Sequence, residues 1–268
     1  MKRRELMTLV VCAVAVWPLN GLLMALALSS PAFAQTPRDD GASFAAEAKD
    51  AATQLQAYLD GVVKGGGRPD FSKPPASDLL GQVFNLKQLA ALPPAQGGDL
   101  TWLMDWVAAA NGANKSIMFF GIAPPVTLTT DPAALQRNIT DYEDQLAAAI
   151  IFLLRITARE IQAAFLFMDQ LPPEQRTRVR KEGFDKMRAA NAQTVINYLG
   201  WIAAGMKPAN ARLVSAALHD TGAVWATAIF PADRPTVLAM LDKAQAATKD
   251  EETRSNLSAF GSLMAKAK

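Results

Sequence analysis

The stretch LAAAIIFLLRITAREIQAAFLFM, residues 146–168, decides the fold. Apolar side chains fill nearly all of its first nine positions, so this part has no solvated helical face. A helix that is apolar on all sides is buried on all sides, and we expect this segment to be the central helix of the domain. Arg155, Arg159 and Glu160 in its middle argue against a membrane span.

The segments around this stretch predict a helical hairpin. Asp131-Pro132 begins the long helix with an N-cap and a proline at the first position, and Pro172-Pro173 ends it near residue 171. A second long helix follows over 174–205. Two long helices joined by so short a turn lie antiparallel.

Two arginines on the first helix need partners. Arg155 and Arg159 are four residues apart and share one face, and an unpaired charge on a buried helix is strongly destabilising. The hairpin brings Asp185 opposite them, so we expect Asp185 to pair with one of the two. A partly buried arginine pair also binds a carboxylate or phosphate well. Arg155, Arg159 and Asp185 are therefore the candidate ligand-binding residues, and the alternative is an internal ion pair that steadies the hairpin.

The rest of the chain repeats the helical pattern. Apolar residues recur at intervals of three and four, alanine is abundant, and no run of strict alternation is present. This predicts an all-α fold, a single helical-bundle domain of roughly eight helices built around the antiparallel hairpin. The other expected helices cover 42–63, 78–92, 99–111 with a second apolar piece over 117–122, 207–230, 233–247 and 251–266. Only Val126–Thr130 resembles a strand.

The N-terminus has the order of a secretory signal peptide. The basic Met1–Arg4 precedes an apolar run over 6–28, and Ala32-Phe33-Ala34 is a small-x-small cleavage site. We expect cleavage after Ala34 and a periplasmic or secreted protein. Two alternatives stay open: an uncleaved membrane anchor, and export by the twin-arginine route through Arg3-Arg4.

The predicted cleavage site divides the whole chain into three parts. Residues 1–34 are the signal peptide, 35–75 an N-terminal helix with a Gly/Pro-rich linker, and 76–268 the helical bundle domain. Cys12, the single cysteine, leaves with the signal, so the mature chain has no disulfide, thiolate metal site or cysteine nucleophile.

The net charge of the mature chain limits the classes of partner that it is expected to bind. Cleavage removes three of 27 basic and one of 25 acidic residues, which leaves 24 of each. A neutral chain without a basic block is a poor partner for nucleic acid or for an anionic membrane surface. The membrane is then reached only through the signal segment, if that segment is not cleaved.

Catalytic and metal-binding patterns are not found in the sequence. His219 is the only histidine, and we expect it to be a polar surface or capping residue. The acidic run Asp141-Tyr142-Glu143-Asp144 is interpreted as a solvated patch, because consecutive helical residues diverge by about 100° each. No phosphate loop, Gly-x-Ser-x-Gly or dinucleotide fingerprint occurs, so we expect no metal and no cofactor.

These patterns favour a non-enzymatic exported protein that binds a hydrophobic or an anionic ligand, or a protein partner. The aromatic and methionine residues have the spacing of a helical core, and the alternative is an apolar cavity for a small hydrophobic ligand. Two other hypotheses remain: an enzyme with an unrecognised acid/arginine site, and a structural envelope protein tethered by its N-terminus.

Overall fold

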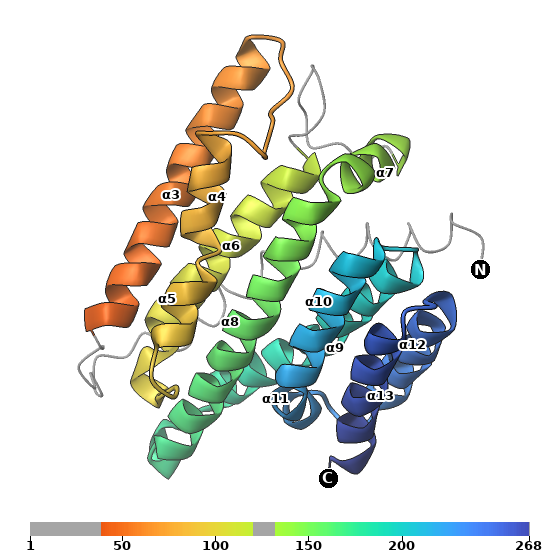
Figure 1. Ribbon diagram of the computed structural model, residues 1–268. Helices are drawn as coiled ribbons and strands as arrows, with labels where there is room; N and C mark the ends of the chain where they lie inside the picture. Colours follow the sequence, from red (N-terminus) through yellow and green to blue (C-terminus); the bar gives the residue numbers. More distant parts are fainter. Residues whose placement is uncertain (1–38, 120–131, 268) are drawn as a thin grey trace. The chain divides into compact units, whose positions relative to one another are not determined.

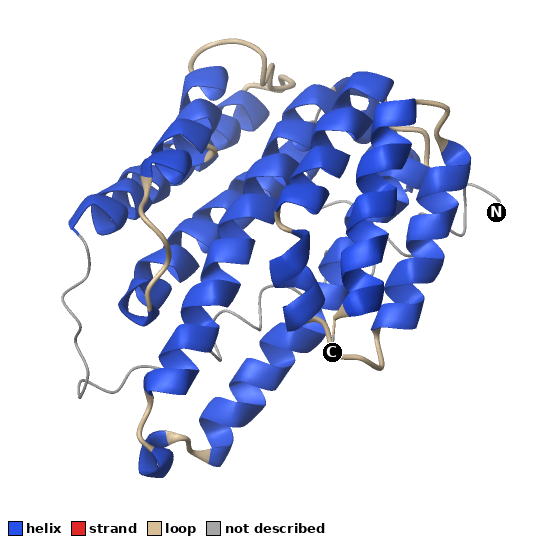
Figure 2. Ribbon diagram, turned by 60° about the horizontal axis from the view of Figure 1, so that its bottom comes forward, coloured by secondary structure: helices blue, strands red, loops and turns tan. Residues whose placement is uncertain are grey.

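The computed structural model describes residues 39–119 and 132–267. Every regular element in these residues is helical, and no strand occurs among them (Figure 2). This confirms the all-α prediction for the described part of the chain. The predicted signal peptide with its cut after Ala34, Cys12 and the short strand at Val126–Thr130 lie outside the described residues.

Eleven α-helices are present in the described residues, where roughly eight were predicted for the chain (Figure 1). They are α3 (Asp39–Lys64), α4 (Ala76–Val83), α5 (Leu86–Ala91), α6 (Leu100–Phe119), α7 (Pro132–Asp141), α8 (Glu143–Gln170), α9 (Arg178–Ala203), α10 (Pro208–Asp220), α11 (Gly222–Ala228), α12 (Arg234–Ala247) and α13 (Glu251–Lys266). Two short 3-10 turns, η2 (Gly97–Asp99) and η3 (Pro173–Gln175), precede α6 and α9.

Three helices that were predicted as continuous are each divided in two. The divisions fall at Asn85, Tyr142 and Thr221. At the first, the Asn85 side chain accepts a hydrogen bond from the Gln88 backbone N–H at 3.0 Å and so caps α5. Conversely, α6 runs without a break through Asn111-Gly112, where the sequence predicted a weakening.

The described residues form two compact units. The N-terminal unit comprises residues 39–95, 99–119 and 132–157, and the C-terminal unit comprises residues 96–98 and 158–267. The boundary between them falls inside α8, which is continuous from Glu143 to Gln170. Each unit is described by itself below.

The core of the N-terminal unit is organised around Trp106 of α6. This helix packs against α3 and α4. The Trp106 ring is fully buried, lies 5.4 Å from the Phe152 ring of α8, and donates its indole N–H to the Val83 carbonyl at 2.9 Å. Gly41 lies against Trp102, and a Cβ on Gly41 would come within 2.5 Å of that ring, so only glycine fits here.

The C-terminal unit contains the last part of α8 and the helices α9 to α13. In it α9 packs against α12, while α13 packs against α10, α11 and α12. Trp225 and Phe260 are fully buried and are among the largest core side chains. Burial of rings of this size contributes much of the hydrophobic stabilisation of a domain.

One face of α8 is more accessible than the sequence suggested. The helix carries many fully buried side chains, including Phe152, Leu153 and Ile161, but a strip along it is half-exposed or exposed. The strip consists of Ala148, Ile151, Arg155, Arg159, Gln162 and Leu166, which recur at helical spacing. The expectation of a helix buried on all sides is therefore wrong along this strip, which leaves Ile151 and Leu166 partly exposed together with alanine and polar residues.

No helix in the described ranges is both long enough and apolar enough to span a membrane.

Candidate functional site

Arg155 and Arg159 lie together on the partly exposed strip of α8. Both side chains are half-buried, and both interact with other groups of the chain. This agrees with the physical expectation that guanidinium groups on a packed helix are compensated. Both side chains remain partly exposed to solvent.

Asp185 lies in α9 with its side chain exposed. Its charge acts on Arg188, where burial lowers the guanidinium pKa and the negative charge of Asp185 opposes that lowering. The pairing of Asp185 with Arg155 or Arg159 stays a prediction.

The Arg188 side chain caps the C-terminal end of the short helix α11. Its Nε donates to the Ala228 carbonyl at 2.8 Å, and a terminal nitrogen donates to the Thr227 carbonyl at 3.3 Å. The guanidinium also lies 4.1 Å from the centre of the Phe230 ring. The last carbonyls of a helix have no partner within the helix, so a cation placed there satisfies them and matches the negative end of the helix dipole.

Arg234, the first residue of α12, also donates a hydrogen bond at the C-terminal end of α11. It is almost completely buried, and it donates to the Ala226 carbonyl at 3.0 Å and to the Ala267 carbonyl just after α13. Arg188 and Arg234 thus hold two helix ends together despite their like charges, which lower the Arg188 pKa further. Both arginines have a structural role here.

A second cluster binds the Gly/Pro-rich loop to the junction between α7 and α8. Arg68 forms an ion pair with Asp141 at 2.5 Å, and its guanidinium lies 4.8 Å from the centre of the Tyr142 ring. The buried Tyr142 hydroxyl donates to the Pro69 carbonyl at 2.9 Å, and Phe71 packs edge-on against the same ring. These contacts fix the loop that the sequence presented as a linker.

The acidic run at residues 141–144 is therefore not a carboxylate cluster. Asp141 pairs with Arg68, Tyr142 points into the core, and Asp144 is exposed. Burial raises the Tyr142 pKa, and the charge of Arg68 opposes that effect. The interpretation of this run as a mostly solvated patch holds for its aspartates, whereas the structural use of Tyr142 was not anticipated.

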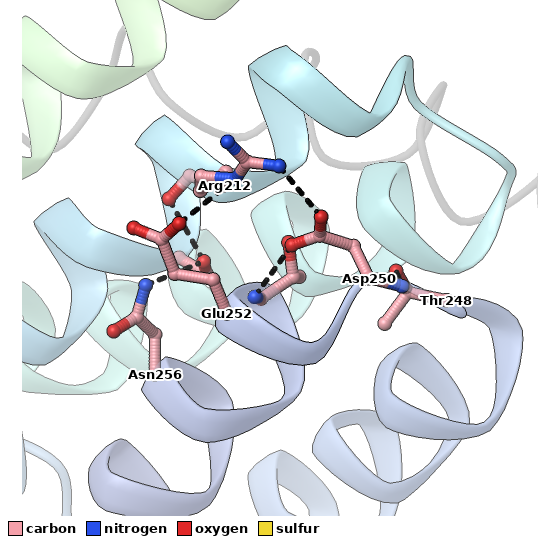
Figure 3. A network of polar contacts seen from close by, with 7 residues as sticks. Arg212, Thr248, Asp250, Glu252 and Asn256 are labelled. Carbon is pink, nitrogen blue, oxygen red and sulfur yellow. Dashed lines mark hydrogen bonds and ion pairs between the residues drawn. The ribbon is translucent and has the colours of Figure 1, made fainter.

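A third polar network joins α10 to the start of α13, and Figure 3 shows its side chains converging. Arg212 binds Asp250 at 2.8 Å and Glu252 at 3.1 Å. Asp250 also caps α13, because its carboxylate accepts from both the backbone N–H and the hydroxyl of Thr253 at 2.8 Å. These bonds, led by the one from Arg212, hold the pKa of Asp250 far below its usual range.

His219 lies in the last turn of α10 and is exposed, as is the neighbouring Asp220. This is the surface position expected for it. Residues 39–119 and 132–267 contain no group of three or more histidine, cysteine, aspartate or glutamate side chains that is able to hold a metal ion.

Two ionisable side chains are half-buried and have no charged partner among the described residues. Glu160 of α8 is half-buried and makes no hydrogen bond or ion pair in the described part of the chain, and burial raises its pKa to about 7. Lys115 of α6 is half-buried, and desolvation lowers its pKa. Such groups are enriched at functional sites, although the enrichment is statistical.

Sequence reasoning brought Arg155 and Arg159 together correctly, because i and i+4 share a face of any helix. It missed the clusters of Arg68, Arg188 and Arg212, whose partners lie 73, 40 and 38 residues away along the chain. No local pattern signals such contacts, although a helix-capping aspartate before Glu251-Glu252 was a usable sign for Asp250.

Comparison with protein-family models, curated proteins and solved structures gives no significant match to this chain.

Proposed function

We propose that the mature chain is an exported, non-enzymatic binding protein whose ligand presents a carboxylate or phosphate to Arg155 and Arg159. The observation that carries the proposal is the placement of two arginines, one turn apart, on a partly exposed strip of α8. A bidentate guanidinium contact at a partly desolvated position is among the stronger ways to recognise an oxyanion. Asp185 is proposed to orient one of the two guanidinium groups.

The proposed location rests on the N-terminal sequence. Positive charge, an apolar run and Ala32-Phe33-Ala34 follow one another in the order of a cleaved signal. We propose that the mature protein begins at Gln35 and works in the periplasm or outside the cell.

The hairpin is proposed as the frame of the binding face. The connection between α8 and α9 is short, the Phe165 and Phe184 rings meet edge-on at 4.9 Å, and Arg188 lies 5.8 Å from the Phe165 ring. These contacts support an antiparallel pair of helices at this end of α8.

Mass spectrometry of the protein purified from its own cells tests the proposal. The native mass is compared with the denatured mass of the same sample. We expect a denatured mass that corresponds to a chain beginning at Gln35, and a native mass that exceeds it by a discrete amount. An intact N-terminus in the denatured sample contradicts cleavage and favours the tethered structural protein. Identical native and denatured masses argue against a resident ligand.

Substitution of each arginine tests whether the ligand binds to Arg155 and Arg159. Arg155→Gln and Arg159→Gln keep a polar side chain and remove the charge, so the extra mass is expected to disappear in both. Arg178→Gln is the matched control, because Arg178 is largely exposed on α9 and pairs only with Glu182 among its charged neighbours in the described residues. Circular dichroism of each variant shows whether the fold is kept, and retention of the ligand by folded Arg159→Gln contradicts the proposal.

A further inference from the structure

The C-terminal end of α8 carries a run of apolar side chains that are not fully covered. Phe165, Leu166, Phe167 and Met168 are consecutive, and each of them is partly accessible to solvent. Successive side chains of an α-helix point about 100° apart, so four in a row face all sides of the helix. Other helices therefore leave this end of α8 incompletely packed.

Apolar surface is also present at the start of α9, which only a short connection separates from α8. The Phe165 and Phe184 rings meet edge-on with their centres 4.9 Å apart, and Met187, one turn further along α9, is partly exposed as well. Val179 in the first turn of α9 is 63% exposed, the highest value among the large apolar side chains that the structure describes. An exposed apolar area with a polar rim commonly marks a site of contact with a protein or a membrane.

Basic residues are concentrated at the same place. Six of the 14 lysines and arginines of the C-terminal unit fall within residues 176–188, against two of its 11 aspartates and glutamates. Lys181 and Lys186 are exposed and form no ion pair with the described residues. The Arg178 side chain is 89% exposed and pairs with Glu182 at 2.9 Å. The neutral net charge of the mature chain does not show this local excess of positive charge.

The position of these charges is unfavourable for α9 itself. Its first turn contains Arg178 and Arg180 and no acidic residue, and Lys181 follows. The N-terminal end of a helix is the positive end of its dipole, where acidic residues stabilise the helix and basic residues do not. Arg180 has a structural role, because it is buried and donates to the Gln175 carbonyl at 2.8 Å. The exposed Arg178 and Lys181 have no such contact, which favours a role for them in binding another molecule.

We infer that this basic–apolar end of α8 and α9, residues 165–168 and 176–188, binds the surface of a membrane that contains anionic lipids. Surface-bound helices place apolar side chains between the headgroups and the acyl chains and keep lysine and arginine at the lipid phosphates. The exposed Val179 and Leu166 fit the first requirement, and the exposed cations fit the second. Nucleic acid is a poorer match, because it has no use for the exposed apolar side chains. The inference holds whether or not the proposed arginine site binds a ligand.

Sedimentation of the mature protein with lipid vesicles tests the inference. One set of vesicles consists of phosphatidylcholine alone, and the other of equal parts of phosphatidylcholine and phosphatidylglycerol. We expect binding to the anionic vesicles and about tenfold weaker binding to the neutral ones. Binding to the anionic vesicles is expected to weaken as sodium chloride is added, because salt screens exposed charges.

Two pairs of variants assign the binding to this end of the helices. Lys181→Gln is expected to weaken binding to the anionic vesicles roughly fivefold. Its matched control is Lys249→Gln, which changes an exposed lysine between α12 and α13 in the same unit. Val179→Ser is also expected to weaken binding roughly fivefold. Its control is Leu213→Ser, since Leu213 of α10 is 56% exposed in the same unit, and both controls are expected to bind as the wild type does.

Three results overturn the inference. The first is that the protein binds neither kind of vesicle, or binds both equally. The second is that Lys181→Gln and Val179→Ser, shown by circular dichroism to be folded, bind as tightly as their controls. The third is a dimer of the wild type in analytical ultracentrifugation that Val179→Ser abolishes, because a second copy then covers this surface. Arg159→Gln, which alters the proposed arginine site, is expected to bind the vesicles as the wild type does, so failure at one site is not mistaken for failure at the other.

Discussion

Glu160 is a half-buried carboxyl group whose raised pKa makes the stability of the C-terminal unit depend on pH. Its pKa is raised from 4.5 to about 7 by burial. At pH values below 4.5 the group is neutral in both the folded and the unfolded chain. Between pH 4.5 and 7 the unfolded chain loses this proton first, so the folded state becomes less stable as the pH rises.

Glu160→Gln replaces the titratable carboxyl group with a neutral amide of nearly the same shape. We expect the variant to match the wild type near pH 4 and to be more stable by about 1–3 kcal/mol at pH 8. Urea unfolding at both pH values measures this difference. Glu174→Gln, at an exposed position in η3, is the control and is expected to behave as the wild type at both. A variant of Glu160 that gains no stability at pH 8 would show that the carboxylate is solvated or paired.

Tyr142 illustrates a residue whose role only the folded chain reveals. Tyr142→Phe deletes the hydroxyl that donates to the Pro69 carbonyl and leaves that buried acceptor without its donor. The expected loss is about 1–2 kcal/mol in the free energy of unfolding, measured with urea. Tyr58→Phe provides the comparison, because the half-exposed Tyr58 hydroxyl bonds to no group of the described residues. Equal stabilities of the two variants would contradict this role of Tyr142.

At the scale of elements, α11 is too short a helix to be stable alone. The Arg188 and Arg234 side chains donate hydrogen bonds to the carbonyl groups at its C-terminal end. Arg188→Met removes the donors to Ala228 and Thr227 and is expected to destabilise the protein by about 2 kcal/mol in urea unfolding. Arg188→Lys is expected to recover less than half of this loss, because an ammonium group lacks the planar fork and stacks less well on Phe230. Full recovery by lysine would mean that charge alone stabilises α11.

The elements also show what the sequence was able to predict. The periodicity of α3, α8, α9, α12 and α13 is local, so their existence and approximate extent followed from the sequence. The interruptions at Tyr142 and Thr221 did not. Tyr142 donates to the Pro69 carbonyl, 73 residues away along the chain, which is a contact that forms only on folding. The Thr221 hydroxyl donates to the Ala217 carbonyl and accepts from the Trp225 indole, each four residues away, and the sequence pattern did not single out these contacts.

The prediction of the candidate site from the sequence was limited for the same reason. Helix geometry placed Arg155 beside Arg159. How far this pair is exposed depends on the packing of other helices, and no single sequence carries that information. Periodicity therefore predicted neighbours along a helix and failed for neighbours across helices.

At the scale of the whole molecule, the two units share one helix. α8 contributes Phe152 and Leu153 to the N-terminal core and Ile161 and Ala164 to the C-terminal core. We expect the units to unfold together, because melting α8 removes core residues from both. Labelling with 5-fluorotryptophan and fluorine NMR in urea follows Trp106 and Trp225 separately, one fully buried in each unit. Two separate midpoints would show that the units are thermodynamically independent.

The position of the boundary inside α8 also bears on how this chain can be divided. Most proteins with two compact parts are cut at an exposed linker, and each fragment then folds by itself. Here a cut between residues 157 and 158 severs an unbroken helix, so each fragment would end in half of α8 with its apolar side chains exposed. Separately expressed halves are therefore suited to fragment complementation, in which neither half is soluble and ordered until the other restores the helix.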